Sequence, residues 1–466
     1  MTSAVADPGS FRDPGGRIFI DGDHVLRAVM PTAAGAYEAV RDSGLLSRLI
    51  DKGMLLAATE VDHGRLGGAV EAPSYVLEHP RIPLVSYPYE WSFPLHKKAA
   101  LLQLDLHLEA LKAGFTLSDA TAYNIQFTGV RPVFIDHLSL RPYREGEYWL
   151  GHRQFCMQFL NPLLMWSLFG VAPNPWFRGG LEGIAPEDLA PLLPLKSRLS
   201  LTVLTHVIAQ AALQKRSIRR NPAGATLQPG RLSPTGFRNM LSELRHFVAG
   251  LKSPTRATVW ADYAENTSYS ADTAAAKRAF VAEMVASQPT DLLIDLGCNT
   301  GDYSEAGLDA GARYVAGFDF DFGALERAHT RFEASGRPFL PLWLDAANPS
   351  PAQGWHEAER KSFSQRVKAD ALIALALIHH VAIGRNVPLP MAVDWLVGLA
   401  PRGIIEFPPK SDPMVQQLLA LREDIFPDYT PQAFRAAVEN RARIVRTLEL
   451  TPGGRQLVWY DRTAAA

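Results

Sequence analysis

The stretch "DLLIDLGCNTGDYS" holds the sharpest chemical motif in the sequence. Its apolar start predicts a buried strand that ends near Asp295, and Gly297 and Gly301 let the backbone turn tightly beyond that end. A ligand can then approach main-chain N–H groups at the crevice outside the strand. Dinucleotide sites use the spacing G-x-G-x-x-G, whereas this turn, which includes Asn299, reads D-x-G-x-x-x-G. The motif therefore predicts a crevice for a different cofactor.

Two later apolar runs bring polar groups to the same edge. "GFDFD" puts Asp319 at the tip of the next strand, where its carboxylate can accept hydrogen bonds from both hydroxyls of a ribose, whereas Asp321 already lies in the following turn. One strand further, "LWLDAAN" brings Asp345 and Ala346 to a strand end. Because the carboxyl ends of parallel strands meet at one edge of a sheet, we expect one crevice lined by all three strands.

The glycine motif resembles motif I of class I S-adenosylmethionine (SAM) dependent methyltransferases. The resemblance implies a Rossmann-like domain that binds SAM, with the third strand end beside the adenine ring. The segment "WADYAENTSYSADTAAAKRAFV" is similar to the entrance segment that many of these enzymes fold over SAM. Its aromatic residues are lid candidates, although they could instead pack the join between domains. The implied SAM-binding residues are Asp295, Gly297, Asn299, Gly301, Asp319, Asp345, Ala346, Tyr269, Tyr263 and Trp260.

The next two expected strands carry candidates for catalysis. "DALIALALIHHVAIG" predicts a strand that ends at His379 and His380, and a histidine there can take the proton from a substrate hydroxyl or amine. We prefer His380, and a hydrogen-bonded structural histidine is the alternative for either residue. "IIEFPPKSDPMV" places Glu406 beside the substrate. It departs from the Asn/Asp-Pro-Pro-Tyr motif of nucleic-acid amino-methyltransferases, which disfavours a DNA or RNA substrate.

A second constellation lies in "SDATAYNIQFTGVRPVFID". A predicted amphipathic helix from His96 leads to Asp119, Asn124 follows five residues later, and Asp136 ends a predicted strand. A phosphoryl-transfer enzyme keeps its base and two magnesium ligands in this order. The alternative is an Asx-type turn that holds a helix to a hairpin.

The spacing resembles that of protein kinases and aminoglycoside-type phosphotransferases. The resemblance implies a possible Mg-ATP site, with Arg27 as the counterpart of the strand lysine and Glu38 as its partner. Leu117 and Ser118 replace the usual His-Arg or His-Gly pair, and no Gly-rich phosphate loop is visible near Arg17. An active kinase and a kinase-like domain kept for binding both remain open.

The elements that position these residues predict two units. We expect a flexible tail over residues 1–14, an α+β kinase-like upper lobe over 15–95 with a hairpin at the Asp21-Gly22 turn, and a mostly helical lower lobe over 96–252. From 256 to 466 apolar runs alternate with helical patterns, which predicts an α/β, Rossmann-like domain with a mostly parallel sheet. The arrangement resembles a bacterial family of SAM-dependent methyltransferases that includes host-specificity nodulation proteins, and, in reverse domain order, the kinase-methyltransferases that cap O-antigen chains.

The composition of the chain limits the classes of partner and the cellular location that we expect. Lys plus Arg (47) nearly balance Asp plus Glu (48), so no global field collects nucleic acid, and the basic run 214–220 reads as a solvated loop or helix end, with a polyanion site as its alternative. Cys156 and Cys298 lie far apart, which argues against a disulfide scaffold or a cysteine zinc site. No secretory signal begins the chain, and polar residues interrupt the apolar stretch 155–172, so we expect a cytoplasmic protein without a membrane span.

Together these features predict a SAM-dependent methyltransferase that acts on a small-molecule or glycan acceptor, at a hydroxyl, with the kinase-like half recruiting or shaping that acceptor. A bifunctional enzyme that phosphorylates and then methylates its acceptor is one alternative. A SAM-binding scaffold without turnover is the other. The sequence names neither the acceptor nor the oligomeric state.

Overall fold

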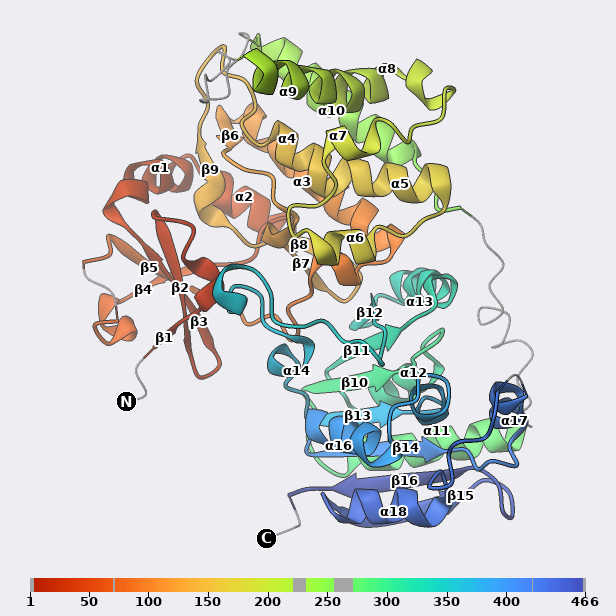
Figure 1. Cartoon of the computed structure of the whole chain (residues 1–466). Helices are drawn as coiled ribbons and strands as arrows, with labels where there is room; N and C mark the ends of the chain where they lie inside the picture. Colours follow the sequence, from red (N-terminus) through yellow and green to blue (C-terminus); the bar gives the residue numbers. More distant parts are fainter. Residues whose placement is uncertain (1–3, 70–71, 221–231, 255–270, 421, 464–466) are drawn as a thin grey trace.

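The computed structural model describes residues 4–69, 72–220, 232–254, 271–420 and 422–463. Figure 1 shows a smaller sheet and a group of helices from the first half of the chain above a large sheet formed by the second half. The predicted order of an α+β unit followed by an α/β unit is confirmed.

The upper lobe is a five-stranded antiparallel sheet in the order β1-β2-β3-β5-β4. Its centre is the predicted hairpin, in which Asp21 pairs with His24 and Gly22 adopts a φ of +57° in the two-residue turn. Helices α1 (Pro31–Asp42) and α2 (Leu45–Asp51) follow the hairpin. The strands are β1 (Val5–Ala6), β2 (Gly16–Asp21), β3 (His24–Val29), β4 (Thr59–Val61) and β5 (Tyr75–His79).

The expectation of a flexible tail over residues 1–14 is wrong for residues 4–14. Val5 pairs with Ile20 at the edge of β2, so the segment adds a strand to the sheet. Two salt bridges then tie the segment to the second half of the chain: the Asp7 carboxylate lies 2.9 Å from Lys361 Nζ, and Arg12 Nε lies 2.7 Å from the Glu359 carboxylate. The residues look like a tail in sequence because their partners are distant along the chain.

The lower lobe is mostly helical, as predicted, around the buried helix α3 (Phe93–Lys112). The apolar stretch 155–172 forms the π-helix η6 (Cys156–Leu160) and helix α5 (Asn161–Phe169), and none of the described helices is long and apolar enough to cross a membrane. The basic run closes helix α9 (Ala209–Arg220). The remaining elements used below are β6 (Phe115–Leu117), β7 (Ile125–Thr128), β8 (Arg131–Phe134), β9 (Leu140–Pro142), α4 (His152–Phe155), α8 (Leu201–Val203), the π-helix η8 (Leu204–Ile208) and α10 (Pro234–Gly250).

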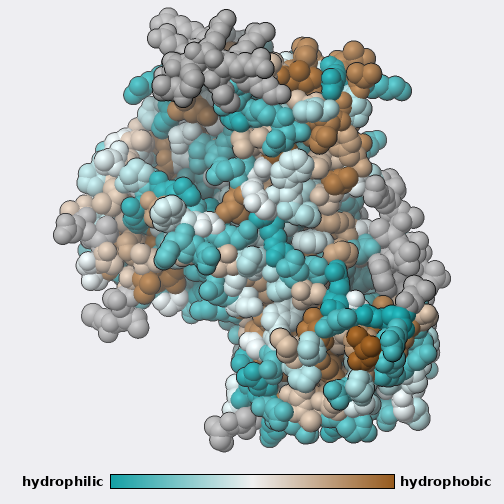
Figure 2. All heavy atoms as spheres, in the orientation of Figure 1, coloured by the Kyte–Doolittle hydropathy of each residue, from teal (hydrophilic) through white to brown (hydrophobic). Residues whose placement is uncertain are grey.

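One surface of the lower lobe is apolar. Figure 2 shows hydrophobic residues gathered over the end of the molecule that carries α8, away from the large sheet. Leu195, Leu199 and Leu201 near this helix are 80%, 87% and 69% exposed. Exposed leucines in such number are more than isolated surface residues and form an apolar surface at this end of the lower lobe.

The second half of the chain builds a seven-stranded sheet in the order β12-β11-β10-β13-β14-β16-β15. The first five strands are parallel, and β16 runs antiparallel to both of its neighbours. The strands are β10 (Leu292–Leu296), β11 (Tyr314–Asp319), β12 (Phe339–Trp343), β13 (Ala371–Ala374), β14 (Arg402–Phe407), β15 (Arg443–Glu449) and β16 (Gln456–Asp461).

Helices cover both faces of this sheet, as a parallel sheet requires. Leu293 on β10 packs into a core with helices α11 (Ala271–Ala286), α12 (Asp302–Asp309) and α13 (Phe322–Ser335). Its neighbour Ile294 points to the other face and joins the core of helices α16 (Leu389–Leu399) and α18 (Pro431–Glu439). The predicted Rossmann-like architecture is confirmed.

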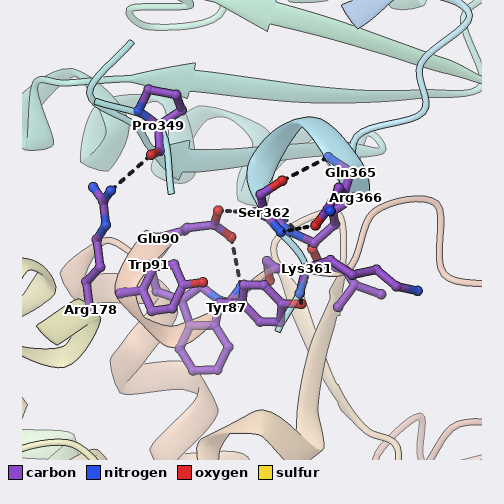
Figure 3. A network of polar contacts seen from close by, with 12 residues as sticks. Tyr87, Glu90, Trp91, Arg178, Pro349, Lys361, Ser362, Gln365 and Arg366 are labelled. Atoms are coloured by element: carbon purple, nitrogen blue, oxygen red, sulfur yellow. Dashed lines mark hydrogen bonds and ion pairs between the residues drawn. The ribbon is translucent and has the colours of Figure 1, made fainter. Parts of the chain in front are cut away.

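A long connection between β12 and β13, residues 344–370, joins the two halves of the molecule (Figure 3). Arg366 forms a salt bridge with Glu90, and the two side chains are only 3% and 2% exposed. The other Glu90 oxygen accepts a 2.8 Å hydrogen bond from the Tyr87 N–H, and the Tyr87 hydroxyl accepts one of 3.1 Å from the Lys361 N–H. Arg178 donates a 2.9 Å hydrogen bond to the carbonyl oxygen of Pro349 at the start of the connection.

Substituting Arg366→Met should destabilise the protein by about 3–5 kcal/mol, because it leaves the buried Glu90 carboxylate without its cation. Urea denaturation followed by intrinsic fluorescence measures the change. Arg441→Met removes an exposed guanidinium that pairs with Asp394 and should leave the unfolding midpoint unchanged. Equal midpoints for wild type and Arg366→Met would contradict the importance of this ion pair.

Candidate functional site

A cavity of about 600 Å³ opens at the carboxyl ends of the parallel strands. Strands β10, β11 and β14 contribute to it, together with the segments just after β12 and β13 and helices α11 and α12. Of the sequence-predicted residues, those that line it are Gly297, Asn299, Asp319, Asp345, Ala346, His379, His380 and Glu406. The volume suits a small-molecule cofactor with part of an acceptor.

The glycine turn after β10 has the conformation that its motif predicts. Gly297 and Gly301 have φ values of +81° and +87°, and Asn299 has a φ of +48°. A Cβ atom at Gly301 would lie 2.6 Å from the Phe332 ring, so only glycine fits beneath this ring. Gly297 and Asn299 line the cavity, whereas Gly301 and Asp295 belong to the same turn but do not line it.

One expectation about the turn needs correction. The motif predicts that its N–H groups face the ligand, but they donate within the protein: Gly297 N and Cys298 N both reach the Phe318 carbonyl oxygen, at 2.8 and 3.0 Å. Asn299 N donates to the Asp319 carboxylate at 2.8 Å. The turn is therefore fixed by β11, and these three N–H groups are already engaged within the protein.

Two carboxyl groups accompany the turn, the half-buried Asp319 and the buried Asp295. Asp319 ends β11, also accepts a 2.8 Å hydrogen bond from Asp321 N, and has a pKa raised to about 6 mainly by burial. Asp295 accepts a 2.6 Å hydrogen bond from the Ser304 hydroxyl, and burial raises its pKa to about 7. Asp319 borders the cavity, so its carboxylate is the acceptor that a ligand's hydroxyl groups would find.

The histidines lie on a helix, where the sequence predicted a strand end. Strand β13 stops at Ala374, and His379 and His380 sit on the short helix α15 (Ile378–Ala382), with ring centroids 4.1 Å apart. Burial, with Arg455 as the second cause, lowers the pKa of His380 to about 4, so its ring is neutral at pH 7 and can accept a proton. His379 is 1% exposed and has a pKa lowered well below its ordinary value by burial, which leaves His380 as the better base.

Glu406 lines the cavity as part of a buried network of charges. Its two carboxylate oxygens lie 2.7 and 2.9 Å from Lys277 Nζ, and one also accepts a 3.3 Å contact from Arg455. Arg455 in turn forms two hydrogen bonds, of 2.6 and 2.9 Å, with the Asp412 carboxylate. The second Glu406 oxygen accepts a 2.9 Å hydrogen bond from Ala376 N, which fixes the chain just before α15. Glu406 therefore positions the loop that leads to the histidines.

Sequence reasoning missed Lys277 and Arg455, which hold Glu406. Lys277 lies on helix α11 within "AAAKRAF", and its neighbour Arg278 makes the pair look like a solvated face. Arg455 lies just before β16, far along the chain from both. The predicted lid residues Trp260, Tyr263 and Tyr269 lie outside the described residues.

The second predicted constellation also comes together. Asn124 Nδ2 lies 3.3 Å from both carboxylate oxygens of Asp119 and 3.3 Å from one oxygen of Asp136. Burial, and then the Asp136 charge, raise the pKa of Asp119 to about 7. Arg27 does not pair with Glu38 as predicted: its guanidinium lies 2.7 Å from Asp136, and Glu38 accepts a hydrogen bond from the Tyr75 hydroxyl instead. The cation that should grip a phosphate is already paired with the expected magnesium ligand.

Comparison with known proteins finds one relative of nearly full length. The chain is 45% identical over 463 residues to nodulation protein NoeA of Rhizobium meliloti strain 1021, covering 98% of this chain and 96% of NoeA. No family model matches the chain.

Three solved structures each align with less than half of the chain. The bifunctional kinase-methyltransferase WbdD is 14% identical, with 43% of this chain and 42% of WbdD covered and a TM-score of 0.31. The N-methyltransferase NodS of Bradyrhizobium japonicum WM9 is 10% identical, with 41% and 97% covered and a TM-score of 0.31. Magnesium protoporphyrin IX methyltransferase from Synechocystis PCC 6803 with bound SAM is 19% identical, with 45% and 86% covered and a TM-score of 0.29.

The buried Asp295 carboxyl group predicts a pH-dependent stability. Its pKa of about 7 lies above its value in the unfolded chain, so the folded state binds this proton more tightly and loses stability as pH rises through 7. Asp295→Asn keeps an acceptor for Ser304 and carries no titrating proton. Its stability relative to wild type should therefore grow by about 2–3 kcal/mol between pH 5 and pH 8.

Urea denaturation at the two pH values measures this difference. Asp291→Asn changes an exposed carboxylate at the start of the same strand and serves as the matched control. Parallel pH profiles for wild type and Asp295→Asn would contradict the assignment.

Proposed function

This chain belongs to the family of nodulation protein NoeA, and from that premise and the geometry of the cavity we propose a SAM-dependent methyltransferase. Its acceptor is a small molecule or a glycan, and the methyl group goes to a hydroxyl oxygen. The observation that carries the proposal is the Asp319 carboxylate, which ends β11 beside the turn at Gly297 and borders the cavity. A carboxylate there accepts hydrogen bonds from the two hydroxyls of a ribose.

The residues of the cavity fit this cofactor. Asp319 ends β11, and Asp345 and Ala346 follow the end of the adjacent parallel strand β12, so the three residues offer contacts along one elongated ligand. When bound, SAM supplies an electrophilic methyl carbon.

We assign His380 as the general base that accepts the proton of the acceptor hydroxyl. With SAM bound as the methyl donor, the neutral His380 ring would accept the proton that the acceptor hydroxyl loses. Because this proton leaves late, most of the acceleration comes from holding the oxygen in line with the methyl group. Glu406 contributes by fixing the Ala376 N–H and with it the start of the loop that leads to α15.

Wild-type protein should bind SAM in isothermal titration calorimetry, and Gly297→Arg should abolish binding because the new side chain fills the cavity at the turn. Gly35→Arg is the matched control, since Gly35 lies exposed on α1 and a Cβ atom added there would meet no other atom within 4 Å. His380→Gln should keep SAM affinity, because His380 is assigned to the acceptor. Wild-type affinity in Gly297→Arg would overturn the proposal.

A SAM-binding scaffold and an enzyme both bind SAM, and only the enzyme transfers the methyl group to an acceptor. Incubation of the protein with methyl-labelled SAM and small-molecule or glycan extracts should label an acceptor with wild type and not with His380→Gln. Tight SAM binding without any labelled product would favour the scaffold.

The bifunctional alternative rests on the convergence of Asp119, Asn124 and Asp136. We infer that this kinase-like centre shapes or recruits the acceptor, because the Arg27 guanidinium already occupies one oxygen of Asp136. Calorimetry with Mg-ATP should therefore show no binding to wild-type protein. Binding that Asp136→Asn abolishes would instead establish a nucleotide site and favour the bifunctional enzyme. A matched Asp51→Asn variant, exposed at the end of α2, reports effects of charge alone.

A further inference from the structure

A third cluster of chemically reactive side chains lies in the lower lobe, away from the methyl-transfer cavity. One ligand atom from each of His152, Cys156 and His206 lies within 4.8 Å of the other two. All three residues are buried, with exposures of 4%, 0% and 6%. The proposed methyl transfer uses none of them.

The backbone is shaped locally to bring the three side chains together. His152 on α4 and Cys156 are four residues apart and therefore share one helical face. Cys156 begins the π-helix η6, and His206 lies within the second π-helix, η8. A π-turn inserts one residue into a helix and occurs often at functional sites. Here both helical segments that supply the cluster carry such a turn.

The distances suit a transition metal. His152 Nε2 lies 2.7 Å from His206 Nδ1 and 3.8 Å from Cys156 Sγ. Zinc binds nitrogen at about 2.0–2.1 Å and thiolate sulfur at about 2.3 Å, so a tetrahedral ion requires the two rings to separate by only about 0.6 Å. The same bond lengths place nitrogen and sulfur about 3.6 Å apart, close to the observed 3.8 Å between His152 Nε2 and Cys156 Sγ.

The outer groups favour the tautomer of His152 that binds a metal. Its Nδ1 lies 2.5 Å from the Tyr148 hydroxyl and 2.8 Å from the Gln210 amide nitrogen, yet one lone pair accepts a single good hydrogen bond. Gln210 Oε1 is buried and has no hydrogen-bond partner within the described part of the chain. Turning this amide over makes Oε1 an acceptor for a protonated Nδ1, which leaves Nε2 unprotonated, with a lone pair that a metal can use.

We propose that His152 Nε2, Cys156 Sγ and His206 Nδ1 bind one divalent transition-metal ion, best matched by zinc, with water as the fourth ligand. A site with thiolate and imidazole ligands binds zinc in preference to magnesium or calcium. Binding releases the thiol proton of Cys156 to solvent, and no electron is transferred. The ion joins α4 to η8, and so holds the segment with the exposed leucines onto the core of the lower lobe.

Cobalt(II) is the probe for this site, because it replaces zinc and has visible absorption. The full chain, purified through a chelator, should bind one equivalent of cobalt with intense tetrahedral d–d bands and a near-ultraviolet thiolate-to-cobalt band. Zinc should then bleach both. Cys156→Ser should lose the thiolate band, and His206→Gln should weaken cobalt binding at least tenfold.

Matched control variants test whether cysteine or histidine residues outside the cluster bind the cobalt. Cys298→Ser removes the other cysteine and His246→Gln removes an exposed histidine of α10, and both should keep the cobalt spectrum. The wild-type spectrum decides the question even if a cluster variant fails to fold. Weak, octahedral cobalt absorption without a thiolate band, or a band that survives in Cys156→Ser and disappears in Cys298→Ser, would overturn the proposal.

Discussion

The buried salt bridge between Glu90 and Arg366 fixes how the two halves of the chain meet. Neither side chain has appreciable contact with water, so each charge depends on the other and on the hydrogen bonds around it. Arg366 belongs to the connection between β12 and β13. That connection starts at the strand end that carries Asp345 and returns as the strand that precedes His379 and His380. Two walls of the cavity are therefore joined by a segment anchored in the other half of the molecule.

The same connection contacts the kinase-like centre. The guanidinium of Arg360 lies 4.2 Å from the ring centroid of Tyr123, which stands in the loop between Asp119 and Asn124. Its neighbours Glu359 and Lys361 hold the N-terminal segment by salt bridges. The connection therefore contacts both the N-terminal segment that holds Asp7 and Arg12 and the loop between Asp119 and Asn124. The loop that holds Tyr123 is therefore joined by one segment of chain to two walls of the cavity.

The sequence predicted those parts of the fold whose signals are local. The glycine turn at Gly297, the hairpin at Gly22 and the alternation of strands with helices each depend on residues within about one element. Strand β15 was not predicted, because its edge position leaves polar side chains such as Arg443 and Arg446 on a strand without an apolar run. The helix that carries the histidines was also missed, since "ALIALALI" continues the apolar pattern past the true strand end at Ala374.

The residues of the candidate sites also divide into those with a local sequence signal and those that depend on distant parts of the chain. Asp319 could be predicted because a carboxylate at the end of a strand is recognisable from the local sequence. The roles of Lys277 and Arg455 depend on their salt bridges with Glu406, which lies on a different element. Cysteine spacing argued against a cysteine zinc site, and that reasoning considered cysteines alone. His206 lies 50 residues beyond Cys156, and only the packing of η8 against α4 brings its ring to the thiol. A cluster of this kind is encoded in tertiary contacts, so no linear motif can reveal it.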